Sequence, residues 1–591
     1  MTDFSINGIP VQAEAGTTIL AAARKAGVII PTLCYNPDLP AWAACGICVV
    51  RVAGSPKLIR ACCTLIDGSF AGKDIVTHDE EIVSMRRILM EMILSNHPDD
   101  CLQCARSGSC ELQTLAAEFG IREVPYGKIV SEVPVDDSNP AVTLEPSKCI
   151  RCGRCVKVCQ EVQNVWALEF IGRGFKGKIA AAADVPLGDS PCIKCGQCAA
   201  YCPVGAIYER DDTAAVWTAL HDPGLHTVVQ IAPAIRVALG EEFGLEPGTL
   251  LTGKLYAALR RLGFKTVFDT NFGADLTVME EGSELVKRLN GGGGEIPMIT
   301  TCCPSWVDYL EKYYPDMIPN FSTAKSPMQM LGVMAKAYWA ETAGIAPEKV
   351  YSVAVMPCTA KKWETRRNDD MKSASKFLGK DAGHDVDIVI TTRELARMIK
   401  LAGIDILNLA EEQPDSPLGP YSGAATIFGV TGGVMEAAVR TAHSLVTGSE
   451  LPGVDFKPAR GFEGVKEAEL DLGGKKIRIA VAHQMGNIES VLEKIRAARK
   501  AGTEMPYHFI EVMACRGGCI AGGGQPYGAT DEVRRKRGAG LYADDKGSQH
   551  RCSHKNPGVA KVYKEFLGEP CGHRSHELLH THYTKREVYT K

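Results

Sequence analysis

Three widely separated segments of the chain carry cysteines in unusual surroundings. Residues 301–306 read TCCPSW, residues 356–362 read MPCTAKK, and residues 511–519 read EVMACRGGC. Cysteine thiolates are the usual ligands of iron–sulfur clusters. Segments this far apart would have to converge in one pocket to hold a single cluster. The pattern therefore predicts a redox reaction at a buried metal centre.

The first 78 residues contain the cysteine spacing of a [2Fe–2S] site. A planar cluster needs four thiolates, usually several from one loop, and a zinc ion is the alternative occupant. Cys63 competes with its neighbour for the fourth position. A hairpin that turns at residues 7–8 and a helix over residues 19–26 are also predicted. The candidate ligands are Cys34, Cys45, Cys48 and Cys62.

Residues 79–120 combine a predicted helix with one histidine and three cysteines. Their spacing is H-x3-C-x2-C-x5-C, from His97 through Cys101 and Cys104 to Cys110. Three thiolates leave one iron of a [4Fe–4S] cluster open, and an imidazole can fill that position. A histidine in place of a thiolate is expected to raise the reduction potential of the cluster. The alternative is a histidine in a solvated loop.

An internal repeat in residues 138–210 is the most specific signal outside the first three segments. The run C-x2-C-x2-C-x3-C occurs twice, which is the spacing of bacterial ferredoxins with two [4Fe–4S] clusters. The fourth cysteine of each run then binds the other cluster. Residues 160–191 form an insert, predicted as a helix and a hairpin. One cluster is expected on Cys149, Cys152, Cys155 and Cys202, and the other on Cys192, Cys195, Cys198 and Cys159.

From residue 211 to residue 530, apolar strand-like runs alternate with helical stretches, as at residues 227–231 and 350–355. This alternation predicts α/β layers with mainly parallel strands. Residues 531–591 form a basic segment with six of the 14 histidines. Cys552-x-His554 and Cys571-x-His573 match no standard zinc spacing, so we expect packing or surface roles for them.

Composition excludes several classes of protein. The chain has 591 residues, 45% of them hydrophobic, so several packed domains are expected. A net charge of −4 gives no electrostatic footprint for nucleic acid. No apolar run reaches the ~20 residues of a membrane span. The first residues lack signal-peptide features, so we expect a cytoplasmic protein. There, 23 cysteines indicate metal clusters rather than disulfides.

The three cysteine segments resemble the active-site motifs of iron-only ([FeFe]) hydrogenases, and the upstream spacings resemble accessory domains of the same family. The likeness covers nearly the whole chain and is strongest for catalytic subunits of multimeric NADP-reducing or electron-bifurcating hydrogenases. It implies a multidomain α/β and α+β fold, and it favours Cys62 over Cys63. The expected parts are a β-grasp [2Fe–2S] ferredoxin domain (1–78), a His-ligated [4Fe–4S] domain (79–120), a bacterial-type 2[4Fe–4S] ferredoxin domain (138–210), a two-lobed α/β hydrogenase domain with the catalytic cluster in its cleft (211–530) and a small-subunit-like helical segment (531–591).

The resemblance also implies the ligands of the catalytic cluster, called the H-cluster. Its [4Fe–4S] cubane would be held by Cys303, Cys358, Cys515 and Cys519, the last of which would bridge to a diiron subsite with CO, cyanide and azadithiolate ligands. Cys302 would exchange protons with the bridgehead amine. A thiol suits that role because its ordinary pKa lies within reach of neutrality. The alternative for this residue is a small buried hydrophobe.

Further residues occupy family positions around this cluster. By resemblance, Lys361 would donate a hydrogen bond to a cyanide. Because Lys361 and Lys362 are adjacent, we expect one of them at the surface. The i,i+3 spacing of two relay glutamates also fits a solvated helix face, and residues 429–436 are expected to line the cleft. The onward proton path would be Glu281, Ser322, Glu284 and Arg288, and the other residues around the subsite would be Met356, Met513, Ala232 and Pro233.

The expected reaction is reversible oxidation of H2 to two protons and two electrons. Electrons would pass through three accessory [4Fe–4S] clusters and one [2Fe–2S] cluster. The chain has no convincing G-x-G-x-x-G unit for a dinucleotide, so flavin and NAD(P) sites and further clusters are expected on partner subunits, with ferredoxin as another candidate partner. One alternative is an H2 sensor, which usually adds a signalling module and alters the relay cysteine. Another is a non-catalytic electron-transfer subunit, which residues 1–210 alone would fit.

Overall fold

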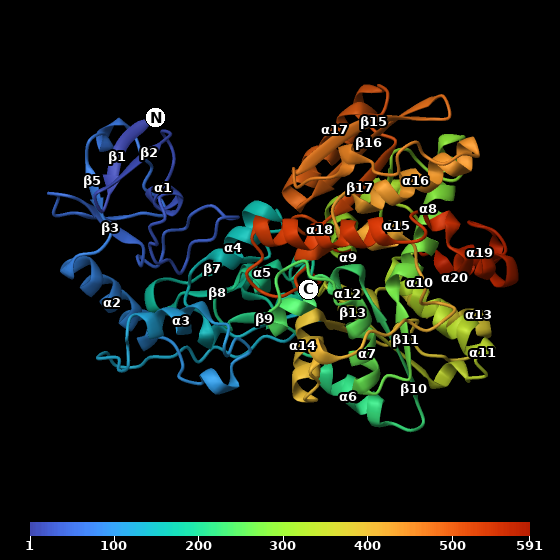
Figure 1. Ribbon diagram of the computed structural model, residues 1–591, viewed down its shortest axis with the longest axis horizontal. Coiled ribbons are helices and arrows are strands. Elements are labelled where there is room, and N and C mark those ends of the chain that lie inside the picture. The colour runs from blue at the N-terminus through green and yellow to red at the C-terminus, as the bar shows by residue number, and fades with distance from the viewer. Residues whose placement is uncertain (591) are drawn as a thin grey trace.

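The computed structural model describes residues 1–590, apart from the side chain of Phe175. Figure 1 shows the N-terminal unit (residues 1–78) and the ferredoxin-like region (residues 138–210) on one side of the molecule. On the other side lies the larger region that the sequence predicts to be catalytic (residues 211–530), which is called the catalytic region. Helix α18 (Asp531–Gly547) crosses the catalytic region between its two lobes. The accessory clusters are therefore expected along a path that leads from the N-terminal end into the catalytic region.

The N-terminal unit is a five-stranded sheet with one helix. Strands β1 (Thr2–Ile6) and β2 (Ile9–Ala13) form the predicted hairpin. Helix α1 (Ile19–Lys25) begins at Thr18, whose hydroxyl accepts a hydrogen bond from the Ala21 amide at 3.1 Å, as an N-cap does. The sheet order is β2-β1-β5-β3-β4, and its other strands are β3 (Val49–Val52), β4 (Leu58–Arg60) and β5 (Asp74–Val76).

Helices α2 (Glu80–Ser95) and α3 (Glu111–Glu118) follow this sheet and lead to the ferredoxin-like repeat. Each cysteine run of the repeat contains one short helix. The insert between the runs forms the predicted hairpin, preceded by a short π-helix (Val158–Val162). The elements are α4 (Arg154–Lys157), α5 (Gln197–Tyr201), the antiparallel pair β6 (Val142–Leu144) and β9 (Ile207–Glu209), and the hairpin β7 (Leu168–Ile171) and β8 (Lys178–Ala181).

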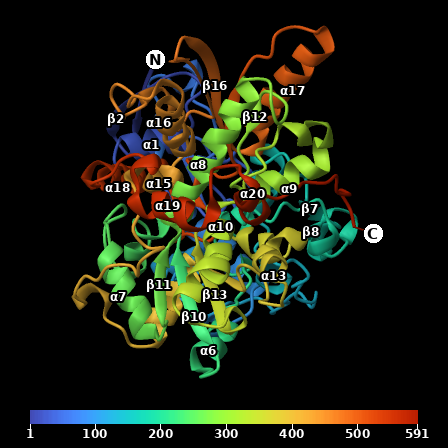
Figure 2. The same ribbon diagram turned by 90° about the vertical axis from the view of Figure 1, so that its right-hand side faces the viewer.

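The catalytic region contains two four-stranded sheets, one above the other in Figure 2. The first is entirely parallel, with the order β11-β10-β13-β14. In the second, of order β12-β17-β16-β15, the first three strands are parallel and β15 is antiparallel. The predicted mainly parallel α/β fold is thus confirmed. The strands are β10 (His226–Ile231), β11 (Thr266–Asp269), β12 (Met298–Ile299), β13 (Val350–Met356), β14 (Ile388–Thr391), β15 (Val465–Leu472), β16 (Lys475–His483) and β17 (Phe509–Met513).

Helices cover both faces of each sheet. Residues of α6 (Thr213–His221), α7 (Thr252–Leu262) and α14 (Thr392–Leu401) share one core with the first sheet. Residues of α9 (Pro304–Tyr313) and α17 (Met485–Ala501) share another with the second sheet. Between the lobes, α8 (Thr270–Leu289) packs on both α10 (Pro327–Met334) and α16 (Gly433–Thr447).

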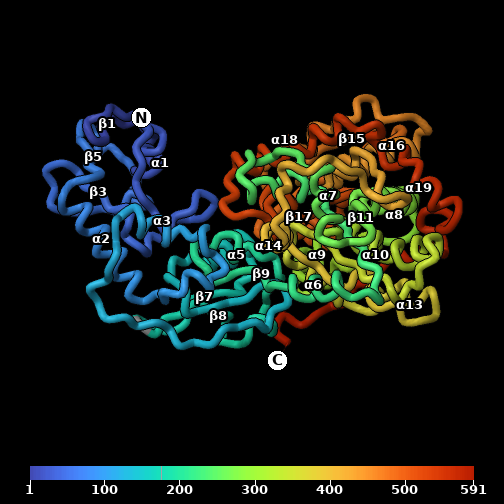
Figure 3. Tube along the Cα trace, turned by 60° about the horizontal axis from the view of Figure 1, so that its bottom comes forward, coloured from blue at the N-terminus to red at the C-terminus, as the bar shows by residue number. Residues whose placement is uncertain are grey.

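The C-terminal segment wraps around these lobes through α18, α19 (Pro557–Val562) and α20 (His573–Leu579). Arg537 is fully buried on Glu241, at 2.6 Å, so part of the basic run serves packing. After α20 the chain pairs with residues 323–325, through hydrogen bonds of 2.8 Å from Lys325 N to Leu579 O and from Thr581 N to Thr323 O. Figure 3 shows the C-terminus beside the ferredoxin-like region.

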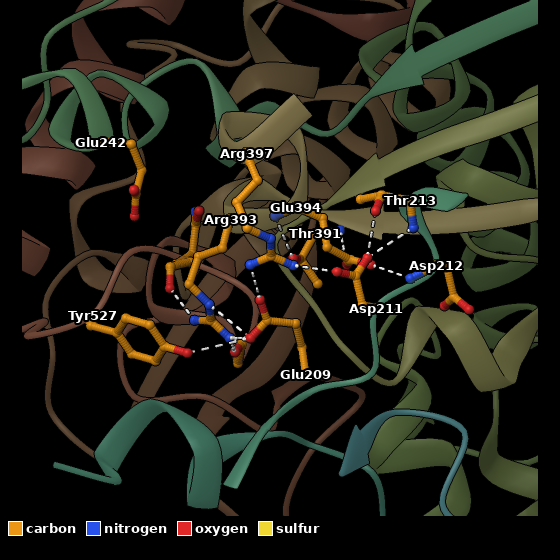
Figure 4. Close-up of polar contacts among 12 residues, drawn as sticks. Glu209, Asp211, Asp212, Thr213, Glu242, Thr391, Arg393, Glu394, Arg397 and Tyr527 are labelled. Carbon is orange, nitrogen blue, oxygen red and sulfur yellow. Dashed lines mark hydrogen bonds and ion pairs between the residues drawn. The ribbon is translucent and has the colours of Figure 1, made fainter. Parts of the chain in front are cut away.

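A buried ion-pair network joins the ferredoxin-like region to the catalytic region (Figure 4). Glu209, at the end of β9, accepts hydrogen bonds from Arg393 at 2.6 Å and from Arg397 at 2.8 Å, both on α14. Burial opposes ionisation of Glu209, but the two guanidinium groups outweigh it and lower its pKa to about 2. The paired charges fix how the two regions meet, because breaking a buried pair leaves an uncompensated charge.

Candidate active site

The three cysteine segments all follow the carboxyl ends of parallel strands. Residues 302–303 come shortly after β12, Cys358 comes two residues after β13, and Cys515 comes two residues after β17. Residues 232–233, directly after β10, reach the same place. In open α/β sheets this edge is where ligands bind. Two lobes contribute two strands each, so motifs far apart in sequence meet between them.

The four candidate cubane thiols lie together. Burial, and then the charges of Cys358 and Cys303, raise the pKa of Cys515 well above its ordinary value. Burial, and then the charge of Cys303, raise that of Cys358 to about 12. Burial, and then the charges of the same two thiols, raise the pKa of Cys519. Thiolates gathered in a buried place repel one another unless a metal is present to stabilise them. This donor set fits an iron–sulfur cluster.

A cavity of about 70 Å³ adjoins three of these thiols, those of Cys303, Cys358 and Cys519. A buried water needs about 10–15 Å³, so the cavity has room for a compact polyatomic group. Cys302 lines it as an additional thiol. Every predicted neighbour of the subsite also lines it, namely Ala232, Pro233, Met356, Lys361 and Met513. Gly429, from the predicted cleft segment, lies there as well.

Lys361 and Lys362 are both buried, at 8% and 7% exposure. The prediction that one of them lies at the surface is wrong. Lys362 makes ion pairs of 2.6 Å with Asp212 and 2.9 Å with Glu394, which compensate the buried charge. Lys361 lines the cavity. Burial disfavours its charged form, but Glu364 at 2.7 Å outweighs that effect and raises the pKa of Lys361.

The predicted proton-relay residues lie on one buried face of α8 and on the segment beside it. Glu281 is 1% exposed, which excludes the solvated helix face. Neither of its carboxylate oxygens has a hydrogen-bond partner among the described residues. Burial, and then the charge of Glu284, raise the pKa of Glu281 to about 8. The nearby hydroxyl of Ser322 counteracts this rise in the pKa of Glu281, although its hydrogen bond, of 3.1 Å, goes to Glu284. Glu284 pairs with Arg288 at 2.5 Å.

The two cysteine runs of the ferredoxin-like region form two groups that match the predicted crossed ligation. The charges of Cys202 and Cys149 help to raise the pKa of Cys152, so these three thiols lie close together. The charges of Cys192 and Cys159 likewise help to raise the pKa of Cys195, so these thiols form a second group. In both cases burial is the larger cause of a raised pKa.

The second of these groups touches the four-thiol site. Gln197 donates a hydrogen bond to the sulfur of Cys515 at 3.2 Å, and Thr359 donates to the carbonyl of Lys194 at 2.9 Å. A side chain at Gly196 would put its Cβ 2.3 Å from the Thr359 hydroxyl, so only glycine allows this approach. The second ferredoxin cluster would therefore lie directly beside the catalytic one.

His97 is placed as a metal ligand would be. Its ring is 8% exposed, its Nδ1 is 2.9 Å from the carbonyl of Pro98, and its Nε2 is buried without a partner among the described residues. A hydrogen bond from Nδ1 to a carbonyl is the usual way to orient a ligating imidazole. Burial also lowers the pKa of His97, which favours the neutral, ligating form.

The N-terminal cysteines also gather in one place. Cys34 lies beside Cys45, and Cys48 lies beside Cys62, close enough for each pair to share a hydrogen bond. Cys62 is 1% exposed, whereas Cys63 is exposed and directs its thiol to the carbonyl of Arg60 at 3.7 Å. This geometry supports Cys62 as the fourth [2Fe–2S] ligand.

Replacing these neighbours separately tests that assignment. C62S is expected to remove or strongly alter the electron paramagnetic resonance signal of the reduced [2Fe–2S] cluster, because a thiolate ligand is lost. C63S is the matched control and should leave the signal unchanged. A changed signal in C63S together with an unchanged one in C62S would reverse the assignment.

Comparison with known families agrees with this geometry. The family described as "Iron only hydrogenase large subunit, C-terminal domain" matches residues 225–523, and "Iron hydrogenase small subunit" matches residues 531–586. This chain belongs to the iron-only hydrogenases. Upstream, a 2Fe-2S cluster-binding domain matches residues 1–70, the NADH-ubiquinone oxidoreductase-G iron–sulfur binding region matches 86–125, and a 4Fe-4S dicluster domain matches 148–206.

Relatives of this hydrogenase extend over its full length. It is 46% identical to the NADP-reducing hydrogenase subunit HndD of Solidesulfovibrio fructosivorans, over 99% of both chains. It is 39% identical to iron hydrogenase 1 of Clostridium pasteurianum, over 99% of this chain and 100% of the other. A solved variant of [FeFe]-hydrogenase HydA1 from Chlamydomonas reinhardtii is 41% identical, with a TM-score of 0.55, over 64% of this chain and 99% of its own. The chain is therefore a hydrogenase catalytic subunit with accessory iron–sulfur domains.

Sequence reasoning missed several residues of the hydrogenase site. Gln197, which contacts Cys515, lies inside a cysteine run, where a polar residue next to Cys198 was the available signal. Phe428 and Met328 line the cavity without any sequence signal of their own. Every described helix is too short or too polar to cross a lipid bilayer.

Cys552 and Cys571 of the C-terminal segment each contact a buried or half-exposed glutamate. Cys552 is buried and lies 3.6 Å from a carboxylate oxygen of Glu450, which His554 also contacts at 3.1 Å. Cys571 and His573 do not form a pair, because His573 is exposed and Cys571 contacts Glu280. The ligand atoms of Glu450, Cys552 and His554 lie within 4.8 Å of one another, as do those of Glu280, Cys571 and His580, so the packing role stays a prediction.

Proposed function

We propose that this hydrogenase oxidises H2 reversibly at an H-cluster whose cubane is held by Cys303, Cys358, Cys515 and Cys519. The observation that carries the proposal is the meeting of these thiols beside a small cavity that a further thiol, that of Cys302, also lines. The donor set suits iron, since all four ligands are thiolates. When bound next to the cubane, the diiron group supplies the metal site at which H2 is split or formed.

The protein prepares the surroundings of that group. Met356 and Met513, each 2% exposed, and Pro233 give the cavity an apolar wall that excludes water. Lys361 adds one positive charge, held in place by Glu364 and by a hydrogen bond from its ammonium to the carbonyl of Cys302 at 3.1 Å. A fixed charge in a dry site acts strongly on an anionic ligand. We therefore assign Lys361 to the cyanide ligand that the family carries.

Protons are proposed to leave the cavity through Cys302 and Glu281. Burial, and then the charge of Glu281, raise the pKa of Cys302, so its resting form is the thiol, which can donate a proton. Glu281 has free carboxylate oxygens and a pKa of about 8, near the working range of a general acid–base group. Ser322 lies between Glu281 and Glu284 and can pass the proton onward.

Electrons are proposed to leave through the two ferredoxin clusters, the second of which would lie beside Cys515. The residues of both outer sites contact residues that would hold or surround the first cluster. Arg154, in the first cysteine run, donates to the carbonyls of Leu33 and Tyr35, which flank Cys34, at 2.8 and 2.9 Å. On the other side, Arg106 donates to the carbonyl of Cys202 at 3.0 Å, and Cys104 packs against Gly205. These contacts favour two outer branches that join at the first ferredoxin cluster.

Replacing His97 tests one branch. H97C is expected to keep a [4Fe–4S] cluster but lower its reduction potential by roughly 100 mV or more, because a thiolate adds negative charge. Redox titration followed by electron paramagnetic resonance measures this potential. H78C, at an exposed histidine, is the control and should change nothing. An unchanged potential in H97C would mean that His97 is not a ligand.

The likeness to an NADP-reducing subunit supports partners for this chain. We propose three accessory [4Fe–4S] clusters and one [2Fe–2S] cluster, with flavin and NAD(P) sites on further subunits and ferredoxin as another candidate acceptor. We propose that the five domains have the boundaries predicted from the sequence, namely 1–78, 79–120, 138–210, 211–530 and 531–591. The reducing cytoplasm, where thiols stay free for metals, is the proposed location.

One experiment separates this enzyme from its alternatives. The matured protein is mixed with H2 and an artificial electron acceptor, and its infrared spectrum is recorded in the CO and cyanide region. Fast H2 uptake with these bands is expected. Very slow uptake with the same bands would indicate an H2 sensor. Absence of both, in protein that carries its accessory clusters, would indicate an electron-transfer subunit and contradict the proposal.

A further inference from the structure

Glu284 is the last carboxylate of the proposed relay. Its hydrogen-bond partners differ in whether they can carry a proton towards the surface. Arg288 holds it at 2.5 Å, but a guanidinium stays protonated at any physiological pH and cannot take up a proton. Ser322 contacts Glu284 at 3.1 Å on the inner side. The hydroxyl of Thr323 lies 3.4 Å from Oε2 of Glu284 on the other side. Among the described partners of Glu284, this hydroxyl is the one that can relay a proton outward.

The next group along this direction is a histidine of the C-terminal segment. Oγ1 of Thr323 lies 2.7 Å from Nδ1 of His580, and Nε2 of His580 lies 3.0 Å from Oε2 of Glu280. The pairing of residues 323–325 with residues 579–581 fixes this geometry through the backbone. Glu284, Thr323, His580 and Glu280 therefore form a continuous chain of polar contacts.

Two members of this series of contacts, Thr323 and His580, line a second cavity of about 680 Å³ at the surface, together with His576 and His582. His580 itself is 5% exposed, and the exposed ring of His576 stacks on it with centroids 4.5 Å apart. The titratable groups that face His580 are Glu280 and Glu284 on α8, Cys571 before α20, and His576 on α20.

We propose that Thr323 and His580 form a proton exit that connects Glu284 with this outer cavity. The inference rests on the proposed relay through Cys302. When Glu284 is protonated, its proton passes to Oγ1 of Thr323 while the threonine proton passes to Nδ1 of His580. The imidazolium is stabilised by the carboxylate of Glu280. The imidazolium then releases its Nδ1 proton to water in the outer cavity, which Thr323 and His580 both line, and keeps its Nε2 proton on Glu280. During H2 formation each transfer runs in reverse.

Histidine suits this position because an imidazole can accept a proton at one ring nitrogen while the other donates, whereas the guanidinium of Arg288 has no acceptor. Tyr563, on the other side of Glu280, is buried with its pKa raised, so it does not offer a second route. The proposal gives one histidine of the basic C-terminal segment a chemical role.

The test compares T323V with T323S in the matured, full-length protein. T323V removes the hydroxyl at nearly constant shape and is expected to lower H2 oxidation about 10-fold and to enlarge the solvent deuterium isotope effect, because proton transfer becomes limiting. T323S keeps a hydroxyl and should restore most of the rate. H580Q should resemble T323V, because it removes the acceptor of the threonine proton. H582Q is the matched control, since His582 lines the same cavity but pairs with Asp370.

Infrared bands of the H-cluster establish that each variant is assembled. A second readout needs no turnover: nitrogen-15 resonances of labelled histidines, assigned with H580Q, should show Nε2 of His580 protonated and Nδ1 as an acceptor. An unchanged rate and isotope effect in T323V, or an equal loss in T323V and T323S, would overturn the proposal. If C302S also keeps full activity, the underlying relay fails; if only C302S is inactive, this exit alone is wrong.

Discussion

Replacing Cys302 with serine is expected to lower H2 turnover by about 10²- to 10⁴-fold, the usual contribution of a positioned general acid. Among the described side chains that line the inner cavity, Cys302 is the thiol left over once the cubane ligands are assigned. A serine hydroxyl fills nearly the same space but ionises far less readily than a thiol, so proton transfer at the cavity would fail. The measurement is H2 oxidation with an artificial acceptor.

Two controls accompany this variant. C302D supplies an ionisable carboxyl at the same position and should recover part of the lost rate. C63S replaces another cysteine that stands beside a proposed ligand, but at the surface, and should keep the full rate. Infrared bands equal to those of the wild type show that the H-cluster is intact in each. A C302S protein with intact bands and full activity would refute the relay role of this thiol.

The second large effect is expected at Glu281. E281Q keeps the shape of the side chain but removes its acid–base function, so H2 turnover should fall by about 10²-fold or more. The glutamate suits the role because burial and the charge of Glu284 raise its pKa to about 8. E311Q is the matched control: Glu311 is also buried with a raised pKa, but it lies on α9 and pairs with Arg367.

The same raised pKa predicts a pH dependence of stability. Between the ordinary glutamate pKa of about 4.3 and about 8, the folded protein keeps a proton that the unfolded chain releases. The free energy of unfolding therefore falls as pH rises through this window. E281Q should weaken that fall in thermal unfolding measured across this range. An identical pH dependence in E281Q and wild type would mean that Glu281 is ionised in the folded protein.

The ligands of the accessory clusters could be predicted mainly from the spacing of the cysteines in the sequence. The grouping of the thiols in the two ferredoxin runs and the buried, unpartnered Nε2 of His97 agree with that prediction. The spacing of ligands is imposed by the size of the cluster, which does not depend on the rest of the fold. The apolar runs at residues 227–231 and 350–355 lie in strands because buried parallel strands are continuously hydrophobic.

Contacts between distant segments could not be read from the sequence. Adjacency in sequence predicts that one of Lys361 and Lys362 lies at the surface. The burial of Lys362 depends instead on Asp212 and Glu394, which only the fold brings to it. His580 likewise meets Thr323 because a C-terminal segment pairs with residues 323–325. Such pairings have no local periodicity, so no pattern in one segment reveals them.

Anomalous diffraction at the iron absorption edge, on crystals of the matured protein, examines the proposed H-cluster directly. The structure predicts iron density bound by the sulfurs of Cys303, Cys358, Cys515 and Cys519, further iron density in the adjoining cavity, and no iron on Cys302. Iron bound by Cys302, or a single zinc ion among the four thiols, would contradict the proposed hydrogenase site.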